Sequence, residues 1–165
     1  MALTSLDIKE PGLNSLPPGV ERYVVEGGGL TGIEILPDDE IEIINNEGNQ
    51  ICEISVFNKD GKSELAILGL KEVKDNSEIK KILFKKDEAS LQALLQLKKR
   101  NLNIEKSKSS IIFDIGTKAG EKVNFISKDK CYCIFAAPGN RMMIHEQNPS
   151  TELTIIVKRS IVKQD

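Results

Sequence analysis

The sequence lacks tryptophan altogether and contains one histidine and three cysteines. So few cysteines, and an odd number of them, exclude a disulfide framework and favour a reducing compartment. Because aromatic residues make up only 4% of the chain, the core must be built mainly from aliphatic side chains. Many Ile and Val residues lie in short runs, which favours strands over helices.

The chain also lacks any apolar window of membrane-span length, and its first residues lack the apolar core of a signal peptide. We therefore expect a cytoplasmic protein. The net charge of -2 does not provide the concentrated basic surface of a general nucleic-acid binder. The lysine clusters at 80–86 and 98–100 are expected to lie on a helix surface.

A chain of 165 residues is most simply one domain. Residues 1–20, rich in Pro and Gly, predict an irregular arm, 21–160 a single β-rich domain and 161–165 a tail. Capping signals and grouped leucines predict a helical insertion at about 76–101. Apolar runs and polar–apolar alternation predict strands within 22–26, 31–37, 39–45, 50–58, 64–70, 110–116, 122–127, 131–137 and 152–159. The expected fold is α+β and mainly β, with a curled antiparallel sheet or barrel whose first five strands form a meander.

A formal G-x-G-x-x-G occurs at Gly27, Gly29 and Gly32, directly after a predicted strand. The dinucleotide fingerprint needs a helix at this point, so that the helix N-terminus meets the pyrophosphate. Another alternating strand follows instead, which predicts a glycine-rich hairpin or bulge. Nucleotide binding is therefore not expected.

The pair Cys131 and Cys133 forms a C-x-C whose side chains share one face of a strand. A closed zinc site needs four ligands, and only Cys52 and His145 remain, so we expect buried cysteines and no metal. Any His-dependent catalysis must use His145, but no nucleophile elbow accompanies it. A hydrogen-bonding loop histidine is the expected role, and no catalytic residue is predicted.

The segment 48–58 does not alternate cleanly, because Gln50 and Glu53 interrupt an otherwise apolar strand. If buried, both side chains need hydrogen-bond partners. Two interpretations stay open: an edge or barrel-rim strand with one wet face, or a polar ligand pocket lined from this strand.

Residues 36–61 resemble the N-terminal half of urea-carboxylase-associated domains, a family of unknown function. The resemblance rests on a strand and turn, an apolar strand, and a Gly-x-Gln with an acid three residues after the Gln: Gly48, Gln50 and Glu53, where the family usually has Asp. Residues 119–159 resemble the same family's ending, with a last apolar strand after an irregular polar loop. The Cys- and His-bearing segment with which family members hold a metal is not visible, since 70–110 is lysine-rich.

Such modules are similar to the extra N-terminal domain of some proteins resembling the glycine-cleavage T-protein, a folate-dependent aminomethyltransferase. The resemblance implies a non-catalytic accessory or small-ligand-binding domain in amine, urea or one-carbon metabolism, without a cofactor of its own. Its ligand, a small carboxylate or amine, would meet residues at one end of the sheet: Gln50, Glu53, Asn58, Asn140, Arg141 and His145. Arg141 would recognise an anion, because a guanidinium binds carboxylates bidentately.

Two other hypotheses stay open. A small metal-dependent enzyme acting on an amide, urea-like or amine substrate would use His145 or the C-x-C. A structural domain would instead pair its sheet edges or N-terminal arm with a second copy or with a T-protein-like domain. Neither nucleic acid nor membrane is an expected partner.

Overall fold

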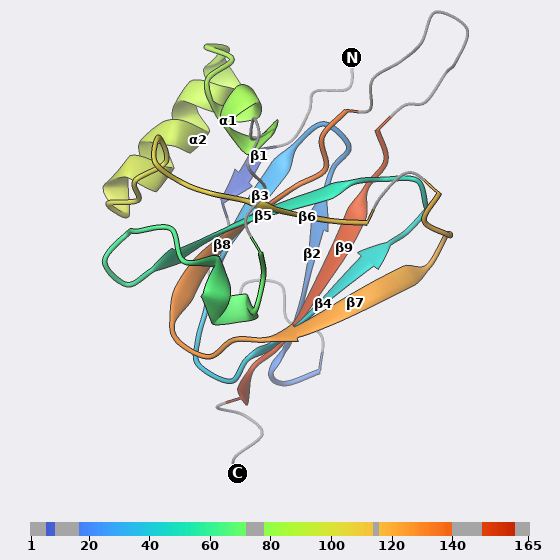
Figure 1. Cartoon of the computed structure of the whole chain (residues 1–165). Helices are drawn as coiled ribbons and strands as arrows, with labels where there is room; N and C mark the ends of the chain where they lie inside the picture. Colours follow the sequence, from blue (N-terminus) through green and yellow to red (C-terminus); the bar gives the residue numbers. More distant parts are fainter. Residues whose placement is uncertain (1–5, 9–16, 72–77, 114–115, 140–149, 161–165) are drawn as a thin grey trace, which may run out of the picture.

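The computed structural model describes residues 6–8, 17–71, 78–113, 116–139 and 150–160, in which nine strands form two sheets (Figure 1). The five-stranded sheet has the order β1-β3-β8-β5-β6 and the four-stranded sheet the order β2-β9-β4-β7. The strands are β1 (Leu6–Ile8), β2 (Val20–Val25), β3 (Leu30–Ile35), β4 (Glu40–Asn45), β5 (Cys52–Asn58), β6 (Ser110–Ile112), β7 (Glu121–Ile126), β8 (Cys131–Ala136) and β9 (Leu153–Lys158). The predicted α+β, mainly β class is confirmed.

All strand pairs are antiparallel except β1 with β3, which are parallel. Successive strands from β2 to β5 alternate between the sheets, so the predicted meander is wrong. The described strands form two facing sheets and not one closed barrel. Strand β1 lies inside the stretch 1–20 that was expected to be irregular.

The main core lies between the two sheets and contains side chains from both. Strand β4 shows the predicted alternation: Ile41 and Ile43 are completely buried, while Glu40 and Glu42 remain partly exposed. Full burial of an aliphatic side chain of this size contributes about 1.5–3 kcal/mol. The alternation of Ile and Glu therefore fixes which face of β4 meets the five-stranded sheet.

The helices α1 (Glu78–Leu83) and α2 (Glu88–Lys99) confirm the predicted helical insertion and lie against the outer face of the five-stranded sheet (Figure 1). They form a second core with β5 and β8, which contains Leu83, Leu97 and Phe57. The carboxylate of Asp87 caps α2 by accepting a hydrogen bond of 2.8 Å from the backbone N–H of Ser90. None of the described helices has the length and apolarity required to cross a membrane.

The run 64–70, expected to be a strand, contains instead the 3₁₀ helix η1 (Leu65–Leu68). Leu65 and Leu68 are three residues apart and therefore share one side of such a helix, where both join the main core. Gly69 ends the turn in a left-handed conformation, with φ at 73°. An apolar run of this length could not distinguish the two structures by periodicity alone.

Candidate functional site

Gln50 lies at one end of the sandwich and joins three pieces of backbone. Its Nε2 donates hydrogen bonds of 2.8 Å to the carbonyl oxygens of Ile51 and Pro138, and its Oε1 accepts one of 2.8 Å from the N–H of Thr151. The residue is completely buried. Since Pro138 and Thr151 stand on either side of 140–149, this one amide ties the chain entering that segment to the chain leaving it.

Asn45, the last residue of β4, extends the same cluster. Its Nδ2 donates a 2.8 Å hydrogen bond to the carbonyl oxygen of Gln50, and this contact fixes which end of the Asn45 amide carries the oxygen. The Oδ1 of Asn45 and the Oγ1 of Thr151 are buried without a hydrogen-bond partner in the described part of the chain. Because an unpaired buried polar atom costs about 1–3 kcal/mol, each of these two oxygens calls for a hydrogen-bond partner other than the described residues.

Two glycines allow the backbone to close around this cluster. A Cβ atom at Gly27 would lie 2.5 Å from the carbonyl oxygen of Ser150, and one at Gly48 would lie 2.6 Å from that of Thr117. Gly48 also has φ at +80°, which L-residues rarely adopt. Gly27, the first glycine of the formal G-x-G-x-x-G, therefore allows its backbone to lie close to that of Ser150. The next element is the strand β3 and not a helix.

Glu53 is also buried, but its carboxylate has other partners. Its Oε2 accepts a 2.7 Å hydrogen bond from the N–H of Glu78 at the start of α1, and its Oε1 accepts one of 2.6 Å from the hydroxyl of Ser109. Gln50 precedes β5, whereas Glu53 lies within it, and these contacts place the Glu53 carboxylate on the face of the sheet that α1 covers. Gln50 and Glu53 were expected to meet one ligand at the same end of the sheet. Their hydrogen bonds instead lie with different parts of the chain.

Asn58 shapes the turn after β5. Its Oδ1 accepts hydrogen bonds from the N–H groups of Asp60 (2.9 Å) and Lys62 (3.1 Å), and its Nδ2 donates to a carboxylate oxygen of Glu64. The other predicted ligand residues, Asn140, Arg141 and His145, lie outside the described residues. The ligand-binding role of all six residues stays a prediction.

The three cysteines are all buried and free, as predicted. The Sγ atoms of Cys131 and Cys133 lie 3.7 Å apart, and Cys131 Sγ lies 3.5 Å from the hydroxyl of Ser127. The hydrogen bond between the two thiols lowers the pKa of Cys131 and, together with burial, raises that of Cys133. In the described residues, no three His, Cys, Asp or Glu side chains are grouped so that they could hold a metal ion.

Burial also raises the pKa of the Cys52 thiol. Cys131, whose pKa is lowered, is protected by its burial alone, and all three thiols are inaccessible to reagents in solution. Because the thiolate is the reactive form and reagents must reach it, we expect none of the three cysteines to react with an aromatic disulfide reagent at pH 8 in the folded protein. All three should react after unfolding in guanidinium chloride. If the folded protein rapidly released one equivalent of the reagent's aromatic thiolate, at least one cysteine would be accessible and the prediction would be wrong.

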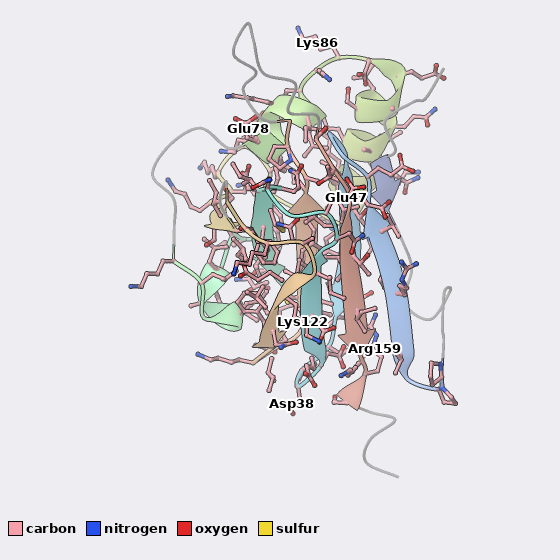
Figure 2. The ribbon with its side chains drawn as sticks, turned by 90° about the vertical axis from the view of Figure 1, so that its right-hand side faces the viewer. Asp38, Glu47, Glu78, Lys86, Lys122 and Arg159 are labelled. Carbon is pink, nitrogen blue, oxygen red and sulfur yellow. The ribbon has the colours of Figure 1, made fainter. Side chains whose placement is uncertain are left out.

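A buried ion cluster that the sequence did not predict lies around Arg159. Its Nε and Nη2 donate to both carboxylate oxygens of Glu21 at 2.9 and 2.8 Å, and its Nη1 donates to Oδ2 of Asp39 at 2.7 Å. The hydroxyl of Tyr23 donates to Glu21. Figure 2 shows Arg159 toward the opposite end of the strands from Glu47, which belongs to the β4–β5 connection.

Burial lowers the pKa of Arg159, but its two carboxylate partners raise it by more, so this side chain remains cationic. Burial, followed by the hydrogen bond to Glu21, raises the pKa of Tyr23 well above its ordinary value. Every oxygen of Asp39 is used, since Oδ1 accepts from the N–H of Ser160 and Oδ2 also accepts from that of Leu36. The cluster is therefore a closed structural network joining β2, the residues that directly follow β9 and the turn before β4.

No family model matches the chain. Trimethylamine-oxide aldolase from Ruegeria pomeroyi is 34% identical over 157 residues, which cover 94% of this chain. The chain spans about a fifth of that relative's length, 20%.

This similarity overturns the expectation of a non-catalytic accessory domain of a T-protein-like aminomethyltransferase, because the relative carries the name of an enzyme, an aldolase. The expectation that this chain has no catalytic activity of its own was wrong for the same reason. That expectation rested on the resemblance to urea-carboxylase-associated domains, on the missing Cys- and His-bearing segment and on the lack of a nucleophile–base pair. Such a pair is a requirement of hydrolytic catalysis by a Ser or Cys side chain. Aldol-type cleavage does not depend on such a pair.

Proposed function

We propose that this chain forms part of an enzyme that cleaves trimethylamine oxide, or a closely related amine oxide, in an aldolase-type reaction. The observation that carries the proposal is the 34% identity to trimethylamine-oxide aldolase across 94% of the chain. Since the chain spans 20% of that protein, the complete reaction is proposed for the assembled enzyme.

The proposed reaction needs no external oxidant. One N-methyl carbon of trimethylamine oxide leaves as formaldehyde and the remainder leaves as dimethylamine. The N–O bond and one C–N bond break, a C=O bond forms, and one hydrogen moves from carbon to nitrogen. The oxygen that was bound to nitrogen becomes the aldehyde oxygen, so the substrate's own N–O bond is reduced while its methyl carbon is oxidised.

The end of the sandwich that contains Gln50 has the polar groups to assist such a substrate. The oxide oxygen accepts hydrogen bonds and so matches the hydroxyl of Thr151, which is buried with no partner in the described residues. The N–H of the amine product needs an acceptor, and Asn45 Oδ1 is a buried acceptor of the same kind. Gln50 would act as a positioning residue. Its side chain accepts a hydrogen bond from the backbone N–H of Thr151, and its backbone carbonyl accepts one from the side chain of Asn45.

The test is an exchange of segments. The 157 matching residues of the Ruegeria protein are replaced by those of this chain, and dimethylamine and formaldehyde are measured by NMR after addition of trimethylamine oxide. We expect the chimera to form both products in equal amounts. A chimera that has the thermal stability of the parent but forms neither product would contradict the proposal; trimethylamine, which lacks the N–O bond, is the substrate control.

The resemblance to urea-carboxylase-associated domains stays a prediction, as does a small carboxylate or amine ligand. A cytoplasmic location is likewise proposed, and the three free, buried cysteines support it.

A further inference from the structure

The exposed large apolar side chains of the helical layer are concentrated around α2. Leu91 and Leu95 expose 53% and 55% of their surface, and Phe84, in the turn before α2, exposes 41%. The helix buries Ala93 and Leu97 against the sheet instead, so the two leucines lie on a different side, directed away from the domain's own core. A pair of leucines four residues apart on an exposed helix surface is typical of a packing surface.

The charges around these leucines are arranged symmetrically. Glu88, Leu91, Leu95 and Lys98 follow one another at spacings of three, four and three residues, which places them on one stripe of α2. All four side chains are exposed. The acid stands near the first turn and the base near the last, and both are equally distant in sequence from Ala93.

We propose that two copies of this chain pair through this stripe, with α2 of each copy antiparallel to α2 of the other. A two-fold axis at the level of Ala93 places Leu91 against Leu95 of the partner subunit and Glu88 beside Lys98 of the partner subunit. Each contact occurs twice, as the symmetry of an isologous interface requires. A parallel pairing would instead place Glu88 beside the partner's Glu88 and Lys98 beside the partner's Lys98, and like charges at an interface oppose association.

The interface is small. Two helices of 12 residues that meet along one stripe cover less surface than a standard stable interface. We therefore expect a reversible dimer that forms at protein concentrations of about 10 µM to 1 mM. The pairing is independent of catalysis and needs no substrate.

Sedimentation velocity of the whole chain over that concentration range tests the proposal. Leu91→Gln/Leu95→Gln should remain monomeric, and its circular dichroism should match that of the natural protein because both side chains are exposed. Gln96→Ala, a change at an exposed position of α2 farther round the helix from the stripe, is the matched control and should dimerise normally.

The charge variants test the antiparallel arrangement itself. Glu88→Lys alone and Lys98→Glu alone should each weaken dimerisation by roughly tenfold, because each creates two like-charge pairs. Glu88→Lys/Lys98→Glu should restore it, because the exchanged charges are again opposite. A natural protein that stays monomeric at 1 mM overturns the proposal, and so does a double charge variant that dimerises no better than the single ones.

Discussion

Arg159→Met should lower the free energy of unfolding by about 3–5 kcal/mol, because it leaves two buried carboxylates without their cation. The side chains of Arg159, Glu21 and Asp39 expose only 7%, 5% and 0% of their surface, so water cannot replace the lost partner. Methionine keeps much of the volume and the apolar stem, which restricts the change to the guanidinium group. Chemical denaturation followed by circular dichroism measures the loss.

Arg22→Met is the matched control, since Arg22 is exposed on the strand that carries Glu21. Its effect should lie within about 0.5 kcal/mol. Arg159→Lys should fall between the two, because an ammonium group keeps the charge but cannot make the bidentate contact with Glu21. Adding Glu21→Gln and Asp39→Asn to Arg159→Met should recover part of the lost stability. If Arg159→Met and Arg22→Met cost equally little, the network does not stabilise the fold.

Local patterns in the sequence predicted most of the elements but not their partners in the sheets, and they missed β1 and η1. The alternation of Glu and Ile in 40–43 fixed a half-buried strand, and the cap at Asp87 with its leucine pattern fixed α2. The assignment of successive strands to different sheets depends on contacts such as β4 with β9, which lie more than a hundred residues apart in the sequence. Periodicity carries no information on such pairings.

The same limit applies to the site. The sequence predicted that Gln50, if buried in its apolar segment, would need hydrogen-bond partners. It is buried, and its partners are backbone groups of Ile51, Pro138 and Thr151. Backbone groups have no sequence signature, and neither does the ion cluster, whose members lie in ordinary strand and turn positions. Asn45 was the one further residue of the site that the sequence could have indicated. It follows Ile41 and Ile43 at the same two-residue spacing, so a polar side chain is predicted at a buried position.

Gln50→Leu should lower the free energy of unfolding by about 2–4 kcal/mol, because it removes the partners of one buried N–H and two carbonyl groups while keeping a similar volume. The change should also act locally. The amide of Thr151 loses its acceptor, so its hydrogen exchange should become faster by roughly a hundredfold relative to amides in β4. Mass spectrometry or NMR of exchanging amides measures both.

Gln96→Leu is the control for this substitution, because Gln96 is exposed on α2 and the chemical change is identical. It should leave the exchange of Thr151 unchanged and alter stability by no more than about 0.5 kcal/mol. Gln50→Glu separates the two halves of the amide: it keeps the acceptor for Thr151 but loses the donor to Pro138. In the segment-exchange chimera, Gln50→Leu should reduce formation of dimethylamine far more than Gln96→Leu does. Equal turnover in the two variants, with fast exchange at Thr151 only in the first, would show that Gln50 holds the backbone at this end of the sandwich without positioning the reaction.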